Sequence, residues 1–377
     1  MSFGKKIQMV DLQGQYHRLK KEIDSAMQSV IEEATFINGP QVKEFGQQLA
    51  NYLQIPHVIP CANGTDALQI ALMALRLQPG DEVIIPAFTY VAAAEVVAMM
   101  GMTPVLVDVD PHTFNIDVNK IEQSISRHTR AIIAVHLFGQ CCHMEPLLQI
   151  AAKYNLYVIE DNAQSIGAEY TFSNGSVLKA GTIGHIGTTS FFPSKPLACY
   201  GDGGAVMTAD NQLAERMRLI ANHGQEQKYQ HKIVGCNSRL DTLQAAILLV
   251  KLKYLSVFTE ARRKVAKRYD DALKGNTRFI APLVSSFSSH VYHQYTLQVK
   301  EEKRDDIQNY LKEKGIPSIV YYPFAIQEQE AYKHIARTPV EIKEAIRLSR
   351  SVLSLPMHTE MTIGEQNYII ETLCKYE

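Results

Sequence analysis

The fold is signalled most clearly by residues 190–204, which read Ser-Phe-Phe-Pro-Ser-Lys-Pro-Leu-Ala-Cys-Tyr-Gly-Asp-Gly-Gly. The uncharged residues 187–192 predict a strand, and the glycines that close the stretch allow tight backbone approach before a second apolar run, residues 205–208. Lys195 therefore lies in a short loop between two strands. A lysine that is partly removed from water loses its charge and becomes a nucleophile, although most lysines are solvated surface groups.

The composition of the 377-residue chain is that of a globular protein large enough for two domains. Its 38 basic and 39 acidic groups nearly balance and form no polybasic run, so we expect no nucleic-acid partner. The apolar runs are too short or too interrupted to span a membrane, and no secretory signal follows the N-terminus. The six scattered cysteines lack CxxC spacing. They predict reduced thiols in a cytoplasmic protein, and no metal site.

Apolar and amphipathic segments alternate through the first two thirds of the chain, which is typical of an α/β fold. Strands are expected at residues 58–59, 82–85, 104–109, 131–135 and 157–159, and helices at 40–53, 63–75, 91–100, 144–154 and 211–222. This spacing predicts a mostly parallel sheet covered on both faces. Ligands of such sheets bind beyond the carboxyl ends of the strands.

The last third has a different pattern, which predicts a smaller α+β domain. After a polar loop at 223–237, residues 240–273 contain no Gly or Pro and predict one long helix between two domains. Strands are expected at 291–299 and 318–322, and a helix at 304–314. Thr338 with Glu341, and Thr362 with Glu365, predict two capping boxes. The expected organisation is an N-terminal arm (1–12), a large domain (13–255) and a small domain (256–377).

Polar residues follow several of the predicted strands. Gly64 and Thr65 open a helix after a strand, where free N–H groups and the Thr65 hydroxyl suit a phosphate; an ordinary helix cap is the alternative. Asp161 ends another strand and could keep a ring nitrogen protonated, or simply cap the next turn. Tyr90 could stack on a flat cofactor or belong to the core, and Ser190 could add a phosphate contact.

A phosphate cradle, a stacking aromatic residue, a strand-end aspartate and a loop lysine together suit pyridoxal 5′-phosphate. A dinucleotide site is not favoured, because the glycines at 201–204 do not open a helix after a strand.

Five motifs in order give the chain a resemblance along its whole length to the DegT-type nucleotide-sugar aminotransferases, which are fold-type I pyridoxal phosphate enzymes. The motifs lie at residues 62–68, 86–91, 160–165, 190–204 and 237–241. The resemblance implies a mostly parallel sheet of the seven-stranded type and a smaller C-terminal domain. It also implies a homodimer with shared active sites.

The resemblance further implies a role for each motif residue. Lys195 would form the covalent link to the cofactor, in its pyridoxal or pyridoxamine form, and Asp161 would pair with the ring nitrogen. Gln164 would bond the ring 3′-oxygen and Tyr90 would stack. The phosphate would be held by Gly64, Thr65 and Ser190, and by Asn237 of the neighbouring subunit. Arg239, Tyr321 and Tyr322 would lie near the substrate.

Within that family the chain is most similar to enzymes that transfer the amino group of L-glutamate to C3 of UDP-2-acetamido-2-deoxy-3-oxo-glucuronate, for surface polysaccharide (lipopolysaccharide O-antigen) synthesis. A dTDP- or UDP-linked 3- or 4-keto-6-deoxyhexose is the alternative substrate. Tyr321 stands where relatives often have His, His185 where they are often acidic, and Asn162 where Ala is common. Lys195 argues against the family's lysine-free dehydratases, and the full set of cofactor residues argues against a non-catalytic regulatory protein.

Overall fold

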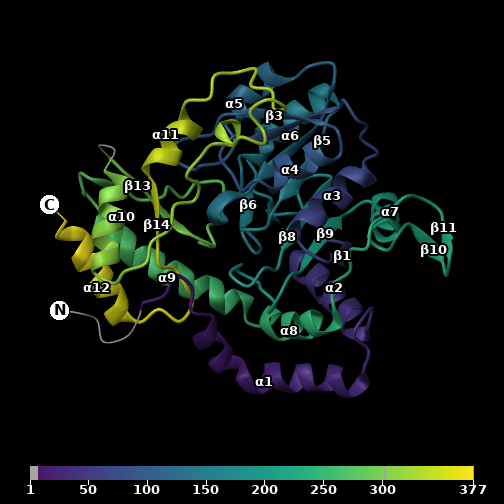
Figure 1. Ribbon diagram of the computed structural model, residues 1–377, viewed down its shortest axis with the longest axis horizontal. Coiled ribbons are helices and arrows are strands. Elements are labelled where there is room, and N and C mark those ends of the chain that lie inside the picture. The colour runs from purple at the N-terminus through teal and green to yellow at the C-terminus, as the bar shows by residue number, and fades with distance from the viewer. Residues whose placement is uncertain (1–6, 301–302, 377) are drawn as a thin grey trace.

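The computed structural model describes residues 7–300 and 303–376, and its centre is a seven-stranded sheet (Figure 1). The strand order is β1 (His57–Cys61), β9 (Gly204–Thr208), β8 (Ile186–Ser190), β5 (Tyr157–Asp161), β4 (Thr129–Val135), β2 (Glu82–Pro86) and β3 (Thr103–Val107). In this order, all neighbouring strands from β8 to β3 are parallel, whereas β9 runs antiparallel to both of its neighbours, β8 and β1. The predicted α/β architecture with a mostly parallel sheet is confirmed.

Both faces of this sheet are covered by helices, because successive strand residues point to opposite sides. In β2, Val83 and Ile85 join a core with α3 (Gly64–Ala74), α4 (Ala92–Met99) and α7 (Asn211–Ala221), and Ile84 joins a core with α5 (Val118–Ile121) and α6 (Met144–Tyr154). Residues of β9 pack under α2 (Pro40–Leu53) and α8 (Thr242–Leu252), and α1 (Leu12–Glu33) lies along α8.

A second sheet carries the C-terminal part of the chain. Its strands are β12 (Phe279–Ile280), β13 (Tyr295–Val299) and β14 (Val352–Leu355), which share a separate core with α9 (Leu255–Leu273), α10 (Arg304–Glu313) and α12 (Ile363–Cys374). Figure 1 shows α9 leading from α8 to these elements. The boundaries at 12/13 and 255/256 stay predictions, and residues 1–6 of the expected arm lie outside the described residues.

The single helix predicted over 240–273 is wrong. The chain forms α8 and α9, bent by 63° at the residues between them. The sequence has no breaker there, but α8 packs against α1 and α2 while α9 packs in the second core, so tertiary contacts set the bend. Among the described residues no single helix is long and apolar enough to cross a membrane; α8 and α9 pass that test only as a bent pair.

Two more predictions in the C-terminal part are wrong. Residues 318–322 form no strand, and only Ile319 makes an isolated bridge, to Ser354. Thr338 caps nothing, since α11 (Glu344–Ser351) begins later and its first N–H groups donate to the carboxylate of Asp108. The Thr362–Glu365 capping box is confirmed, with both reciprocal hydrogen bonds present.

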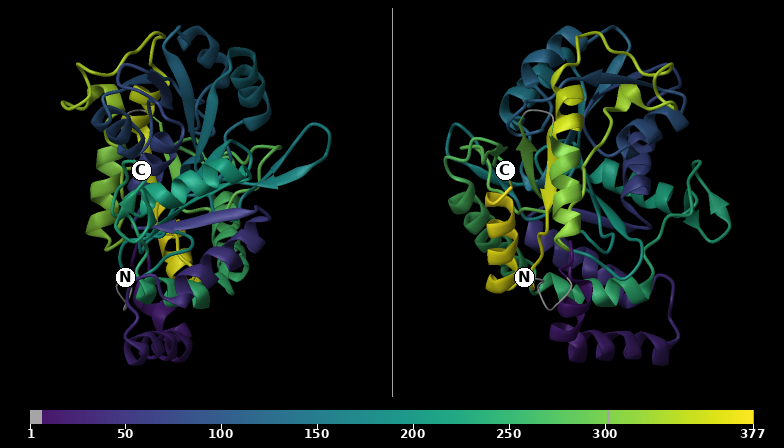
Figure 2. Two further views of the ribbon diagram at one scale, coloured as in Figure 1. Left: turned by 90° about the vertical axis from the view of Figure 1, so that its right-hand side faces the viewer. Right: turned by 60° about the vertical axis from the view of Figure 1, so that its left-hand side comes forward.

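The polar loop predicted at 223–237 contains a short hairpin, β10 (Gln225–Gln227) and β11 (Gln230–His231), which stands out from the body of the molecule (Figures 1 and 2). A further hairpin, β6 (Glu169–Thr171) and β7 (Val177–Lys179), follows β5. Neither hairpin pairs with the main sheet. Tyr170 of β6 is buried in the core that contains α5 and α6, whereas every residue of β10 and β11 is at least partly exposed.

Candidate active site

Lys195 lies in the loop between β8 and β9, beside the start of α3. A side chain on Gly204, the first residue of β9, would place its Cβ 2.3 Å from the carbonyl oxygen of Asn63, so glycine permits this close approach. The Lys195 side chain is half-buried. Burial lowers the pKa of its amine from the ordinary value to about 8. The negative charge of Asp161 favours the protonated amine and so opposes this lowering. The amine is therefore partly neutral near pH 8.

Asp161 ends β5 on the same edge of the sheet, where it interacts electrostatically with Lys195. Burial raises the pKa of its carboxyl group, and a hydrogen bond from the N–H of Ala163 to Oδ1 (3.0 Å) opposes that rise, as do the charges of Lys195 and His136. The capping interaction that we kept as an alternative is thus present. No described residue donates a hydrogen bond to the other carboxylate oxygen, Oδ2, which is left to bind a ligand.

The N-terminus of α3 faces Ser190, the last residue of β8. Asn63 caps the helix by accepting from the N–H of Asp66 (2.8 Å), and no described residue accepts from the N–H of Gly64 or Thr65. A Cβ on Gly64 would lie 2.7 Å from the Cβ of Ser190. The helix cap is therefore made. The phosphate site stays a prediction, which the two N–H groups that remain beside the Ser190 hydroxyl support.

Four further predicted site residues lie close to one another, with Tyr322 in contact with the other three: Tyr90, Gln164 and Tyr321. Tyr90 is 59% exposed, so it does not belong to the core, and its ring lies 6.2 Å from that of Tyr322. Gln164 accepts from the N–H of Phe138 (2.7 Å) and donates to the hydroxyl of Tyr322 (3.2 Å). The Tyr321 ring is 5.8 Å from the Tyr322 ring. Asp161 also acts on Tyr322, whose pKa is raised chiefly by burial.

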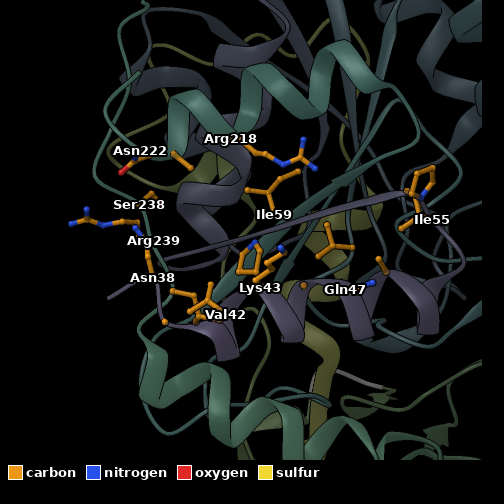
Figure 3. Close-up of a pocket in the computed structure, with 18 of the residues that line it drawn as sticks. Asn38, Val42, Lys43, Gln47, Ile55, Ile59, Arg218, Asn222, Ser238 and Arg239 are labelled. Carbon is orange, nitrogen blue, oxygen red and sulfur yellow. The ribbon is translucent and has the colours of Figure 1, made fainter. Parts of the chain in front are cut away.

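Asn237 and Arg239 are not brought to this group. Asn237 is exposed beside Asn222. Arg239 lines a pocket of about 720 Å³ between α2, β1 and α7, and neither Lys195 nor Asp161 lines it. Figure 3 shows Arg239 at the Asn38 end of this pocket, away from Gln47 and Ile55. The roles of Asn237 at the cofactor phosphate of a second subunit and of Arg239 near the substrate stay predictions.

The structure adds two buried groups that sequence patterns did not single out. His136 and Glu160 pair below Asp161 (2.8 Å), and Glu160 also accepts from the N–H groups of Ile183 and Gly184 (2.6 Å each). His293 is buried (5% exposed); burial lowers its pKa well below the ordinary value, and the positive charges of Lys195 and Arg262 lower it further. His136 and His293 lie outside the five motifs, and the motif at 160–165 contains Glu160 without implying a role for it. Among the described residues no three His, Cys, Asp or Glu side chains are grouped to hold a metal ion.

These residues fit pyridoxal 5′-phosphate. The turn formed by Gly64, Thr65 and Ser190 suits a phosphate, the free oxygen of Asp161 suits a protonated ring nitrogen, and the Lys195 amine suits an aldehyde. The fit rests most directly on the N–H groups of Gly64 and Thr65, which no described residue accepts from, at a turn where glycine lets the chain approach Ser190 closely (a Cβ on residue 64 would lie 2.7 Å from the Ser190 Cβ).

Comparison with known proteins agrees with this geometry. At 47% identity over 353 residues, the chain resembles a UDP-2-acetamido-2-deoxy-3-oxo-D-glucuronate aminotransferase of Pseudomonas aeruginosa, covering 93% of this chain and 95% of that protein. At 41% identity over 370 residues it resembles a dTDP-3-amino-3,6-dideoxy-alpha-D-galactopyranose transaminase of Aneurinibacillus thermoaerophilus, covering 98% of this chain and 99% of that protein.

Solved structures of related proteins share the fold of this chain. A DegT DnrJ EryC1 StrS aminotransferase from Brucella abortus superposes with a TM-score of 0.93, 40% identity and 98% coverage of both chains. NtdA from Bacillus subtilis, solved with the bound cofactor PMP, superposes with a TM-score of 0.89 and 33% identity, over 98% of this chain and 84% of that one. The DegT/DnrJ/EryC1/StrS aminotransferase family model matches residues 17–374. The chain belongs to this family of pyridoxal phosphate-dependent aminotransferases.

Proposed function

We propose that this enzyme transfers the amino group of L-glutamate to C3 of UDP-2-acetamido-2-deoxy-3-oxo-glucuronate, in the synthesis of a cell-surface polysaccharide such as lipopolysaccharide O-antigen. The observation that carries the chemistry is the half-buried Lys195 amine, whose pKa is lowered to about 8, facing the strand-end carboxylate of Asp161. The choice of sugar is supported by the 47% identity to the Pseudomonas enzyme of that name.

Each site residue has a task that follows from its place. Pyridoxal phosphate supplies an aldehyde that accepts amino groups and a ring that withdraws electrons from the reacting carbon. Lys195 would hold the cofactor covalently at that aldehyde. When it is free, its amine, partly neutral near pH 8, would act as the general base that accepts a proton from the α-carbon of the amino donor.

Asp161 keeps the ring nitrogen protonated through its free oxygen, while Gln164 and Tyr90 hold the ring in place. The phosphate is bound by Gly64, Thr65 and Ser190 at the N-terminus of α3, where the helix dipole favours an anion.

A homodimer with shared sites accounts for the positions of Asn237 and Arg239. Both lie away from the Lys195 loop of their own subunit, and Phe36 and Ile37 nearby are exposed (45% and 47%) and tied to the same segment by a bridge from Ile37 to Asp241. Exposed apolar side chains around a functional arginine suit a subunit contact. We place the dimer in the cytoplasm, where nucleotide-linked sugars are substrates.

Mixed dimers test the shared site. Lys195→Ala subunits and Asn237→Ala subunits are each expected to form inactive homodimers. In a mixed dimer, one site combines the intact Lys195 with the intact Asn237 of the neighbour, so about a quarter to a half of the wild-type activity should return. Mixtures that stay inactive would show that each subunit builds its own site.

The sugar is tested by a coupled assay with glutamate as donor. UDP-linked 3-keto-uronate should be aminated at least ten times more efficiently than dTDP-linked 3- or 4-keto-6-deoxyhexoses, because Arg239 and the two tyrosines must distinguish a carboxylate from a methyl group. The deoxyhexose remains the second candidate, supported by the 41% identity to the dTDP-sugar transaminase. A preference for that substrate would overturn the choice of sugar and leave the transamination intact.

A further inference from the structure

The tight turn Leu137–Gly139, which follows β4, holds its backbone in an uncommon conformation. Phe138 has φ +59° and ψ −5°, in the left-handed region that bulky side chains rarely adopt, and Gly139 has φ +123°. Glycine is needed at 139, because a Cβ there would lie 2.7 Å from the backbone nitrogen of Tyr292. Backbone strain of this kind persists only where surrounding contacts hold it, and it is commonest at functional sites.

This conformation directs the N–H of Phe138 to the side chain of Gln164, whose Oε1 accepts from it (2.7 Å). A backbone N–H can only donate, so the contact decides which end of the amide faces the turn. The amide nitrogen, Nε2, is thereby left for other partners. It donates to the hydroxyl of Tyr322 (3.2 Å), and no other described residue accepts from it, so one N–H of this buried amide (6% exposed) is free for a ligand.

Asn115 holds the turn from the other side. Its side chain is 3% exposed; Oδ1 accepts from the N–H of Leu137 (2.9 Å), and Nδ2 donates to the carbonyls of Gln140 (3.3 Å) and Cys141 (3.2 Å). These three hydrogen bonds lie on both sides of Phe138 along the chain. Among the described residues no hydrogen bond joins Asn115 to Gln164, so any effect of Asn115 on that amide passes through the turn.

We propose that Asn115 is a positioning residue, which holds the Phe138 N–H against Oε1 of Gln164. The Gln164 amide then offers a donor, and not an acceptor, to the ring 3′-oxygen of the cofactor. A donor stabilises negative charge on that oxygen, whereas a carbonyl oxygen in the same place would oppose it. The inference rests on the proposed function and deepens it, since it explains how the chain selects the charge state of the 3′-oxygen.

The test follows the visible absorbance of the cofactor on Lys195 in the loaded full-length protein as the pH is raised. The midpoint reports the proton shared between the lysine nitrogen and the 3′-oxygen. A donor on the 3′-oxygen withdraws negative charge from that proton and so lowers the midpoint. Gln164→Met, which removes the donor, should therefore raise the midpoint by about one unit, and Asn115→Ala by about half a unit. Asn115→Ala should add nothing in a Gln164→Met background, because Asn115 acts through Gln164.

Gln140 provides a matched control in the same loop. It is 1% exposed, its Nε2 donates to the carbonyl of Leu283 (2.8 Å), and its Oε1 accepts from the N–H of Ser285 (3.1 Å). Gln140→Ala removes a buried amide with two hydrogen bonds to backbone and leaves the bonds to Leu137 and Phe138 in place. It should lower the stability of the fold as Asn115→Ala does, and leave the midpoint at the wild-type value.

A midpoint that is unchanged or lower in Asn115→Ala would overturn the proposal, as would an equal rise in Gln140→Ala or an additive rise in the double variant. If Asn115→Ala does not fold, Gln164→Met decides alone: a rise supports a donor facing the 3′-oxygen, and a fall or no change overturns it. Wild-type protein that takes up no cofactor on Lys195 would overturn the proposed function, whereas a normal titration that does not depend on Asn115 would overturn this inference only.

Discussion

Lys251 offers a quantitative test of how burial shifts lysine pKa values in this protein. Its side chain is 1% exposed, and its ammonium, which lies 4.2 Å from the centre of the Tyr200 ring, has no hydrogen-bond acceptor among the described residues. Burial lowers its pKa from 10.5 to about 8. That shift corresponds to a penalty of about 3 kcal/mol for keeping the charge in the folded chain, at about 1.36 kcal/mol per pKa unit.

Replacing Lys251 by Met removes the penalty and keeps an unbranched side chain of similar length. The contact with Tyr200 offsets up to about 2 kcal/mol of the penalty. We therefore expect Lys251→Met to increase the free energy of unfolding at pH 7 by about 1–3 kcal/mol. The comparison is made by urea unfolding of the cofactor-free protein, with the exposed Lys253→Met as the control that should change little.

The gain should depend on pH with a definite sign. Because the folded-state pKa (about 8) is below the unfolded value of 10.5, the penalty is fully present below pH 8 and disappears as the pH rises toward 10.5. The stability difference between Lys251→Met and wild type should thus shrink to near zero by pH 10.5. A variant that is less stable than wild type at pH 7, or a difference that does not change with pH, would refute the reasoning.

Further predictions concern the cofactor site. Asp161→Ala should bind pyridoxal phosphate weakly and retain little turnover, because nothing then keeps the ring nitrogen protonated; an unchanged visible absorbance and rate would contradict its role. Gly64→Ala should weaken cofactor binding about tenfold, since its Cβ would meet Ser190 at 2.7 Å, and fluorescence titration of the cofactor-free protein measures this. Wild-type affinity of Gly64→Ala for the cofactor would contradict this expectation. Ser190→Ala should weaken cofactor binding less, by about threefold, because the two N–H groups at the start of α3 remain.

Sequence patterns predicted the main sheet, the α3 turn and the Lys195 loop, because each depends on local signals such as apolar strands, a cap and a glycine run. Sequence patterns did not predict the features that depend on contacts between residues distant in the sequence. The bend between α8 and α9 carries no Gly or Pro, and α11 is capped by Asp108, a residue more than 230 positions earlier in the chain.

The candidate site likewise contains residues that sequence motifs predicted and residues that they did not. Lys195, Asp161 and Gly64 lie in recognisable motifs, and the structure brings them to one edge of the sheet. The buried pair of His136 and Glu160 was not predicted, since the two residues lie 24 positions apart in the sequence and meet only in the folded sheet. Asn237 is a different case, because its predicted partner is the cofactor phosphate in the neighbouring subunit.

The central claim is that one amine, that of Lys195, binds the cofactor covalently opposite a carboxylate that keeps the ring charged. Borohydride reduction of the purified protein, followed by mass spectrometry of its peptides, tests this directly. We expect the reduced cofactor on Lys195, and in Lys195→Ala no labelled peptide. A colourless protein that gains no label after pyridoxal phosphate and borohydride, or a label on another lysine, would contradict the account.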